Sequence, residues 1–306
     1  MEKENYLKNT SEIMVSICCI CYNQHSFLPE TLKGFNSQEI DFIIEVIIYD
    51  DCSTDGSREI LKSFKESCKY PVTLILSEEN RYSKGDRIFP KTFKQAKGKY
   101  IALCEGDDYW TDPYKLQKQV DFLEANPDYS LCFHKVKILD KENGLVDDFI
   151  TENRYEKIKK FPITQDSLYK YSNFIHTPSV VFKNVVKKFP MELYLSPVGD
   201  YLLYFLLSKH GYLHRINECM AVYRYGHGIY SSASVKKKKI IGKQFQICLL
   251  SFIDSEYIKK DIIQKTLNNI RYTENKNIDN LTTTDLTREI YKRIWLKTKK
   301  NFKKLL

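Results

Sequence analysis

Three short apolar runs, each followed at once by polar residues, constrain the fold of this chain more than any other feature. They cover residues 15–21, 43–49 and 100–104. Between them lie two segments of helical length and one further strand candidate, at residues 26–38, 57–68 and 72–76. Nearly continuous apolar runs are typical of strands covered on both faces, and strands that alternate with helices specify a parallel sheet with right-handed crossovers. The sequence therefore predicts an α/β fold in which the polar strand ends meet at one edge.

The most informative strand end is Glu105-Gly106-Asp107-Asp108. Open parallel sheets bind ligands beyond the carboxyl ends of their strands, and Mg²⁺ or Mn²⁺ bridges protein carboxylates to nucleotide phosphates. The alternative is an acidic turn that caps the next helix. Asp112-Pro113 already supplies an N-cap aspartate and a proline at the first helical position, so we interpret Asp107 and Asp108 as functional. The expected cofactor is a divalent cation, Mn²⁺ or Mg²⁺.

Together with the other strand ends, this turn resembles the inverting family-two glycosyltransferases with the GT-A fold. The matching pieces are Tyr22-Asn23, the loop at residues 50–57, the approach at 96–101 and the acidic turn. Each piece alone is weak evidence, whereas their order and spacing are specific. The resemblance is strong from about Val15 to Asn126, continues more weakly to Tyr223-Arg224 and fades in the last third. It implies a Rossmann-like, mostly parallel central sheet flanked by helices, with a helical C-terminal extension.

The resemblance also implies how a nucleotide is held. Asp51 is similar to the carboxylate that accepts the imide hydrogen of uracil, and Tyr22 to the residue that borders the base. Ile20 occupies a position where many relatives carry threonine, which removes one polar contact to the nucleotide. Arg81 and Lys84 fall where relatives place a basic loop over the nucleotide, although ordinary surface solvation explains both equally well.

In the acidic turn, the resemblance makes Asp107 the acid that approaches the ribose and Asp108 the metal ligand. Relatives often have aspartate at the position of Glu105, so a second register, with Glu105 and Asp107 as the outer carboxylates, stays open. His227 matches a histidine that helps to hold the metal or the diphosphate, while a structural or exposed histidine is the alternative. Arg224 is expected to contact the diphosphate through its forked donors.

Asp200 matches the catalytic base of the family, which removes a proton from the acceptor hydroxyl. Its alternative role is that of an N-cap, because residues 202–207 form an apolar, helical run. We expect the acceptor to contact four further residues, with core packing or turn hydrogen bonds as the alternative for each: Tyr109, Trp110, His176 and Thr177.

For domain organisation we expect a GT-A catalytic domain at 1–232 and a helical, basic extension at 233–306. The catalytic domain divides into a nucleotide-sugar-binding half at 13–128 and an acceptor-binding half at 129–232. Strand candidates at 131–139 and 174–182 flank a polar excursion at 140–160. Cys18, Cys19 and Cys21 lie in one strand whose side chains alternate between faces, so we assign them to the core.

The net charge of +9 is concentrated in lysine-rich runs at 236–239 and 297–304. A basic amphipathic helix from about Thr284 could lie on an anionic membrane, pack on the catalytic domain, or pair with a second copy. Nucleic acid is not an expected partner, since the basic runs lie away from the site and resemble no binding module. The odd number of cysteines, nine, and the absence of a secretory signal before Met14 favour the cytoplasm, with the inner face of the membrane as a further possibility.

The predicted function is transfer of a sugar from a nucleotide-diphosphate donor, with UDP favoured and GDP or dTDP open. The acceptor is expected to be a glycan or lipid-linked glycan, the anomeric configuration is expected to invert, and the family suggests bacterial surface polysaccharide synthesis. The alternatives are a non-catalytic nucleotide-sugar-binding module and a sugar-phosphate nucleotidyltransferase. The latter has a glycine-rich loop after its first strand, whereas Tyr22-Asn23-Gln24-His25 follows here.

Overall fold

The computed structural model describes residues 12–158, 162–186, 188–228 and 230–274. The chain divides into two compact units, Met1–Cys248 and Leu249–Leu306, which are described separately. The amphipathic helix expected from Thr284 and the lysine-rich run at 297–304 lie outside the described residues.

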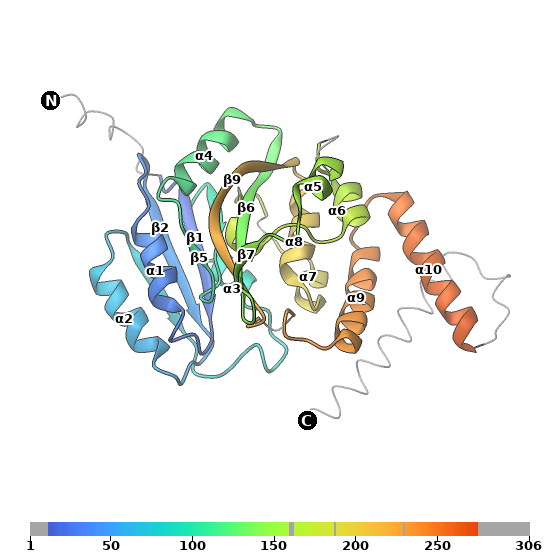
Figure 1. Ribbon diagram of the computed structural model, residues 1–306, viewed down its shortest axis with the longest axis horizontal. Coiled ribbons are helices and arrows are strands. Elements are labelled where there is room, and N and C mark those ends of the chain that lie inside the picture. Colours follow the sequence, from blue (N-terminus) through green and yellow to red (C-terminus); the bar gives the residue numbers. More distant parts are fainter. Residues whose placement is uncertain (1–11, 159–161, 187, 229, 275–306) are drawn as a thin grey trace. The chain divides into compact units, whose positions relative to one another are not determined.

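Four parallel strands form the first half of the sheet in the first unit (Figure 1). Their order is β3 (Val72–Leu76), β2 (Ile44–Asp50), β1 (Val15–Cys21), β4 (Tyr100–Leu103). Every residue of β2 and all but Ile20 of β1 are buried, which explains their unbroken apolar character and confirms the core assignment of the three cysteines. Cys21 pairs with Asp50, so the polar loops that follow β1 and β2 begin side by side.

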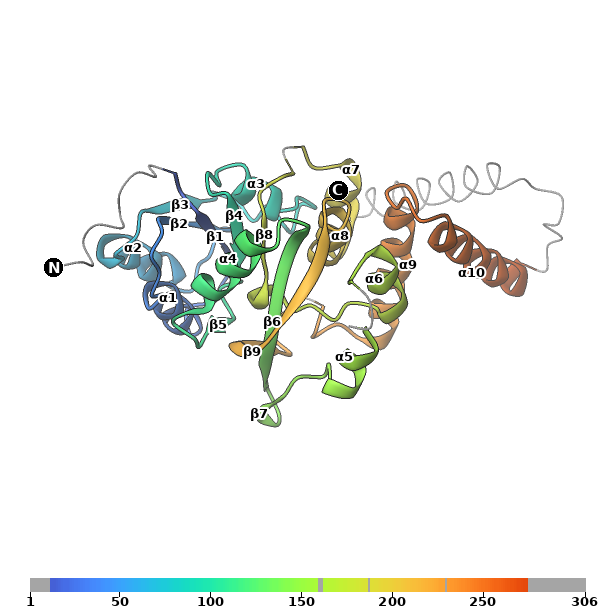
Figure 2. The same ribbon diagram turned by 90° about the horizontal axis from the view of Figure 1, so that it is seen from above.

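Helices cover both faces of this parallel half, as the α/β prediction requires. α1 (Leu28–Asn36), α2 (Ser57–Ser67) and α4 (Lys115–Ala125) lie on one face, and α3 (Phe89–Phe93) lies on the other (Figure 2). α1 buries Leu28, Leu32 and Phe35, the spacing of one face of an α-helix. The packing of this stripe against the sheet fixes α1, and α1 holds the end of the loop that follows β1.

The predicted start of α4 is wrong. The helix begins at Lys115 with Tyr114 at the N-cap position, so Asp112 does not cap it. Asp112 instead accepts a hydrogen bond from the backbone N–H of Tyr114, at 2.8 Å, and forms an ion pair with Lys118, also at 2.8 Å. Asp112 and Pro113 thus belong to a turn that precedes the helix, closed by the hydrogen bond from the Lys115 N–H to the Asp112 carbonyl at 3.2 Å.

The second half of the sheet is mixed. β8 (Val181–Lys183) is antiparallel to β4 and to β6 (Tyr129–Asp140), whereas β9 (Tyr212–Tyr225) runs parallel to β6. β5 (Tyr109–Trp110) is antiparallel to β9, with Tyr109 opposite Val222. Because β5 follows the acidic turn directly, this pairing brings the turn next to the end of β9.

The excursion expected at 140–160 contains regular structure, which corrects the prediction. β7 (Gly144–Asp147) pairs with β6, and α5 (Glu152–Ile158) follows. The remaining elements up to α8 are α6 (Gln165–Tyr171), a 3₁₀ turn η1 (Thr177–Ser179), α7 (Met191–Leu195) and α8 (Gly199–Leu207).

Two helices occupy the described part of the chain beyond Ser232, as expected. α9 (Val235–Leu250) belongs to the first unit as far as Cys248, and α10 (Glu256–Glu274) belongs to the second. Among the described residues, no helix combines the length and apolar character needed to cross a bilayer.

Candidate active site

The site is built around the turn that joins β4 to β5. The backbone N–H of Gly106 donates to the carbonyl of Ile20 at 2.9 Å, which ties the turn to β1. A Cβ atom at Gly106 would lie 2.5 Å from Gln24 Oε1 and 2.8 Å from the Cβ of Cys21, so only glycine fits here. One carboxylate oxygen from each of Glu105, Asp107 and Asp108 lies within 4.8 Å of the other two. The sequence pattern therefore becomes a real cluster of oxygen ligands.

The environment of the cluster disfavours its negative charges. Burial, with added repulsion from Asp107 and then Asp200, raises the pKa of Glu105 to about 8. Burial also raises the pKa of Asp107, and it raises that of Asp108 well above its usual value, with repulsion from both neighbouring acids. Strongly perturbed carboxyls that converge at a sheet edge are typical of functional sites. An all-oxygen set of this kind fits a hard divalent cation.

The three acids differ in accessibility. Glu105 is half-buried and Asp107 is 8% exposed, whereas Asp108 is fully buried. Asp108 Oδ1 accepts a hydrogen bond from the backbone N–H of Arg224 at 2.8 Å, and its Oδ2 has no partner among the described residues. By exposure, Glu105 and Asp107 are the outer carboxylates, while Asp108 contributes an oxygen to the same cluster from a buried position.

Arg224 braces the turn from behind. Its Nη1 donates to the carbonyl oxygen of Asp107 at 2.6 Å and its Nη2 to Glu30, while the guanidinium lies 4.6 Å from the ring centre of Tyr109 and 4.9 Å from that of Phe27. Only 4% of Arg224 is exposed. We therefore correct its expected role: the side chain holds the acidic turn against α1 instead of presenting its fork to a diphosphate.

His227 lies at the other side of Asp107. The residue is exposed, its ring packs edge-on against Phe27 at 5.0 Å, and its charge lowers the pKa of Asp107. The turn after β9 therefore brings this histidine close to the carboxylate cluster.

Asp200 approaches the cluster from the acceptor half. It lies in the first turn of α8, whose N-cap is Val198, so the alternative of a plain N-cap is ruled out. Burial raises the pKa of Asp200, and the Thr177 hydroxyl lies 3.5 Å from its Oδ2. Since Asp200 in turn raises the pKa of Glu105, the two carboxyls interact across the site.

His176 is fixed by a partner that the sequence analysis missed. Its Nε2 lies 2.8 Å from Asp148 Oδ1, and its ring centre lies 5.1 Å from that of Tyr223. Asp148 follows β7 in the segment interpreted as a polar excursion, where nothing in the local pattern distinguishes it. Tyr223 was missed as well; burial and then repulsion from Asp108 and Glu105 raise the pKa of its hydroxyl, which places it among the acids.

The nucleotide residues expected from the sequence lie at the ends of β1 and β2. Asp51 is 2% exposed; its Oδ1 accepts the backbone N–H of Arg81 at 2.8 Å and its Oδ2 that of Tyr82 at 2.9 Å. Tyr22 is 46% exposed, and Ile20 is half-buried in β1. The position expected for the base thus borders the segment after β3, which Asp51 binds through two backbone N–H groups.

The basic side chains of this segment point to a common acid. Arg81 Nη1 lies 2.8 Å from Glu79 Oε1, and Lys84 also pairs with Glu79. All three side chains are well exposed. Arg81 and Lys84 are therefore near the expected nucleotide position, with their charges directed to Glu79.

The loops after β1 and β2 brace each other. Asn23 adopts a left-handed conformation, with φ of 51°, and its backbone N–H donates to Ser53 Oγ at 2.9 Å. Asp55 accepts hydrogen bonds from the backbone N–H of His25 at 2.9 Å and from the hydroxyl of Ser57 at 2.5 Å. These residues therefore shape the loop that carries Asp51.

The expected role of Trp110 as an acceptor contact is wrong. The residue is 4% exposed, its Nε1 donates to the carbonyl of Pro178 at 2.9 Å, and its ring packs edge-on against Phe35 at 4.9 Å. Lys115 Nζ lies 4.1 Å from the centre of the same ring. Trp110 is thus a core residue and has no free face for a sugar. Tyr109 is half-buried with Arg224 over its ring.

The comparisons with known proteins agree with this geometry. The sequence profile described as Glycosyl transferase family 2 matches residues 16–189. A Mycobacterium tuberculosis protein named as uncharacterized is 36% identical over 228 residues, which make up 74% of this chain and 63% of that protein. The chain therefore spans somewhat less than two thirds of this relative. A Bacillus subtilis protein named "Putative teichuronic acid biosynthesis glycosyltransferase TuaG" is 27% identical over 229 residues, or 74% of this chain and 84% of that protein.

Two solved structures share the architecture. TarS of S. aureus (residues 1–349), in complex with UDP, has a TM-score of 0.59 and 18% identity, covering 87% of this chain and 74% of that one. The mannosyltransferase PcManGT from Pyrobaculum calidifontis, in complex with GDP-Man and Mn²⁺, has a TM-score of 0.56 and 15% identity, covering 89% and 76%. Similarity at these identities shows the fold, while the profile matches more than half of the chain. The chain belongs to glycosyl transferase family 2 and has the GT-A fold.

Proposed function

We propose that this protein transfers a sugar from a nucleotide-diphosphate donor to a glycan or lipid-linked glycan, with a divalent cation and with inversion at the anomeric carbon. The observation that carries the proposal is the meeting of acids from the two halves of the fold, Glu105 and Asp107 after β4 and Asp200 in α8. The relative named for teichuronic acid biosynthesis supports a polysaccharide or lipid-linked product.

The cation would be held by Glu105 and Asp107, with Asp108 buried behind them. When bound, the cation stabilises the negative charge that develops on the leaving diphosphate. Arg224 keeps the turn in place by holding the Asp107 carbonyl and the Asp108 carboxylate from β9. His227, beside Asp107, is a further candidate for this region.

Asp200 acts as the general base in the proposal. A carboxyl whose pKa is raised by burial is well matched to removing a proton from a hydroxyl near neutral pH. The Thr177 hydroxyl and the His176–Asp148 pair flank Asp200 and fit contacts to the acceptor sugar. Direct attack by the acceptor from the face opposite the leaving group gives inversion.

Asp51 and Tyr22 form the base site of the proposal. UDP is the first candidate because the imide N–H of uracil is a donor that suits the Asp51 carboxylate. Both Asp51 oxygens already accept backbone N–H groups, so uracil must share an oxygen or displace the contact with Arg81 or Tyr82. GDP stays an alternative, since one structural neighbour was solved with GDP-Man.

We place the reaction at the inner face of the membrane. α9 exposes Lys236, Lys237 and Lys239 beside Val235, which is 72% exposed, and Ile240, which is 50% exposed. Such a basic surface with aliphatic side chains suits an anionic lipid surface. Sedimentation with anionic vesicles, against neutral vesicles, checks this part of the proposal.

Calorimetric titration with UDP, GDP, dTDP and UTP, each with and without Mn²⁺, tests the donor. We expect Mn²⁺-dependent binding with UDP the tightest; a preference for UTP would favour a nucleotidyltransferase. With an α-linked donor and a matching acceptor, NMR of the product should show a β-linkage. A retained configuration would overturn the mechanism, and donor binding without hydrolysis or transfer would indicate a non-catalytic binding module.

A further inference from the structure

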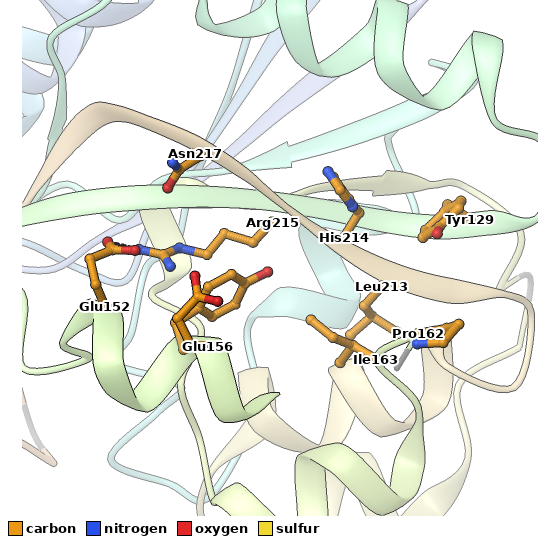
Figure 3. Close-up of a pocket in the computed structure, with 10 residues that line it drawn as sticks. Tyr129, Glu152, Glu156, Pro162, Ile163, Leu213, His214, Arg215 and Asn217 are labelled. Atoms are coloured by element: carbon orange, nitrogen blue, oxygen red, sulfur yellow. Dashed lines mark hydrogen bonds and ion pairs between the residues drawn. The ribbon is translucent and has the colours of Figure 1, made fainter. Parts of the chain in front are cut away.

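A pocket lies in the acceptor half, away from the acidic turn. It has a volume of about 540 Å³ and opens between α5 and the first half of β9 (Figure 3). Leu213 and Ile163 form an apolar floor, tied together by the hydrogen bond from the Leu213 N–H to the Ile163 carbonyl at 3.1 Å. Glu156 of α5 and Asn217 of β9 also line the pocket. Its volume falls within the range of small-ligand sites, about 300–1,000 Å³.

Arg215 gives this pocket an unsatisfied donor. The residue is 6% exposed; Figure 3 shows its side chain reaching from β9 toward Glu152, to which Nη2 donates at 3.1 Å. The guanidinium carbon lies 3.9 Å from the ring centre of Tyr155. Nη1 is buried without a hydrogen-bond partner among the described residues. A buried charged donor without an acceptor is unfavourable, so a ligand oxygen beside Nη1 would be stabilising.

The charges around the pocket favour a neutral ligand. Arg215 and Lys135 balance Glu152 and Glu156, and Lys135 Nζ lies 2.7 Å from Glu152 Oε1. An anion would meet both carboxylates, whereas a hydroxyl can accept from Arg215 and donate to a glutamate. The apolar floor suits the C–H face of a sugar ring, whereas the Tyr155 ring is buried and covered by Arg215. Among neutral ligands, a sugar meets all of these requirements together.

The pocket lies on the acceptor side of the transfer site. In the β6–β9 register Arg215 pairs with Phe133 and Tyr223 pairs with Ile138, five residues along β6. At the rise of a strand this corresponds to a separation of roughly 16 Å. Because side chains alternate along a strand, Phe133 and Ile138 lie on opposite faces of β6, so an acceptor that reaches both positions must pass around the edge of the sheet. α5 also begins four residues after Asp148, the partner of His176. The segment that runs from Asp148 into α5 therefore borders both the pocket and the His176 side of the transfer site.

We propose that this pocket binds a neutral sugar unit of the acceptor glycan, at a distance from the unit that receives the new sugar. The link to an acceptor rests on the proposed function, but the binding of sugar does not. The probes are four neutral trisaccharides, namely cellotriose, N,N′,N″-triacetylchitotriose, maltotriose and mannotriose, with a trisaccharide containing glucuronic acid as the charged comparison. Binding is measured by saturation-transfer NMR and calorimetry on the full chain.

The decisive variant is Asn217→Trp, which fills the exposed side of the pocket without altering Arg215. The matched control is Glu218→Trp, because Glu218 is exposed and pairs with Lys118 of α4 instead of lining the pocket. We expect at least one neutral trisaccharide to bind, Asn217→Trp to weaken it by about tenfold or more, and Glu218→Trp to leave it unchanged. Arg215→Gln should have the same effect as Asn217→Trp, and thermal melts verify that each variant folds.

Three results would overturn the inference: no neutral trisaccharide bound at millimolar concentration, full binding by Asn217→Trp, or a clear preference for the charged trisaccharide. UDP titrations on the same samples separate this inference from the proposed function. Glycan binding without UDP binding would remove the donor proposal and keep the pocket. UDP binding without glycan binding would do the reverse.

Discussion

The affinity of the acidic turn for Mn²⁺ should depend steeply on pH, because Glu105 must lose a proton before it can bind a cation. Burial and the neighbouring acids raise the pKa of Glu105 to about 8. The deprotonated fraction of a carboxyl with this pKa falls from one half at pH 8 to about 1% at pH 6, so affinity should fall by roughly 50-fold, or about 2.3 kcal/mol. Near pH 7, each Mn²⁺ should displace close to one proton.

The same shift predicts the pH dependence of stability. The ordinary pKa of the glutamate is 4.5, so between this value and about 8 the folded protein binds more protons than the unfolded chain. The metal-free protein should therefore lose stability as pH rises through this window. Mn²⁺ should restore it most at the upper end of the window.

Calorimetry from pH 6 to 8.5, in two buffers with different heats of ionisation, measures affinity and proton release together. Asp200→Asn removes one source of repulsion on Glu105, so the midpoint of the pH profile should move to lower pH. Asp41→Asn, an exposed acid on another loop, is the control and should leave the midpoint unchanged. A flat affinity between pH 6 and pH 8, with no proton released, would refute the assignment of Glu105 to the cation site.

Three further outcomes are expected. Asp200→Asn should lower turnover by roughly 10²–10⁴ while donor binding persists, and normal turnover would remove Asp200 as the base. Asp51→Ala should weaken UDP binding by about 1.5–3 kcal/mol in calorimetry; an unchanged Kd would exclude the base contact. Lys115 is fully buried, and burial lowers its pKa from 10.5 to about 7. Lys115→Met should therefore stabilise the protein at pH 7 by about 2–3 kcal/mol, after the loss of its hydrogen bond to Gln119. Urea unfolding measures this increase in the free energy of unfolding, which should shrink as pH rises from 7 to 10.5. An increase that does not depend on pH would contradict the buried-charge explanation.

The parallel half of the fold could be predicted from local patterns. The run at 15–21 and the strand candidate at 72–76 coincide with β1 and β3. A strand buried on both faces requires apolar residues at nearly every position, and this requirement is visible in a few consecutive residues. The acids at 105–108 follow such a run, so their location at the edge of the sheet was also predictable.

The surroundings of single side chains could not be predicted in this way. Trp110 and Tyr109 are adjacent aromatics after an acidic turn, a pattern that suits both sugar stacking and core packing. The pairing of β5 with β9 places the Trp110 side chain in the core. The same holds for Asp148, which the fold brings to His176 across 28 residues of sequence.

The order of the acids in the site shows where sequence alone reaches its limit. The chain itself determined that carboxylates follow β4, because the apolar run and the acids are contiguous. Which carboxylate faces outward was decided by the backbone N–H of Arg224, which binds Asp108 from 116 residues away. Periodicity in the sequence indicates whether a residue is buried, whereas a hydrogen bond between distant strands leaves no mark on the residues near either end. Only the tertiary structure therefore shows that Asp108 is fully buried while Glu105 and Asp107 keep some exposure.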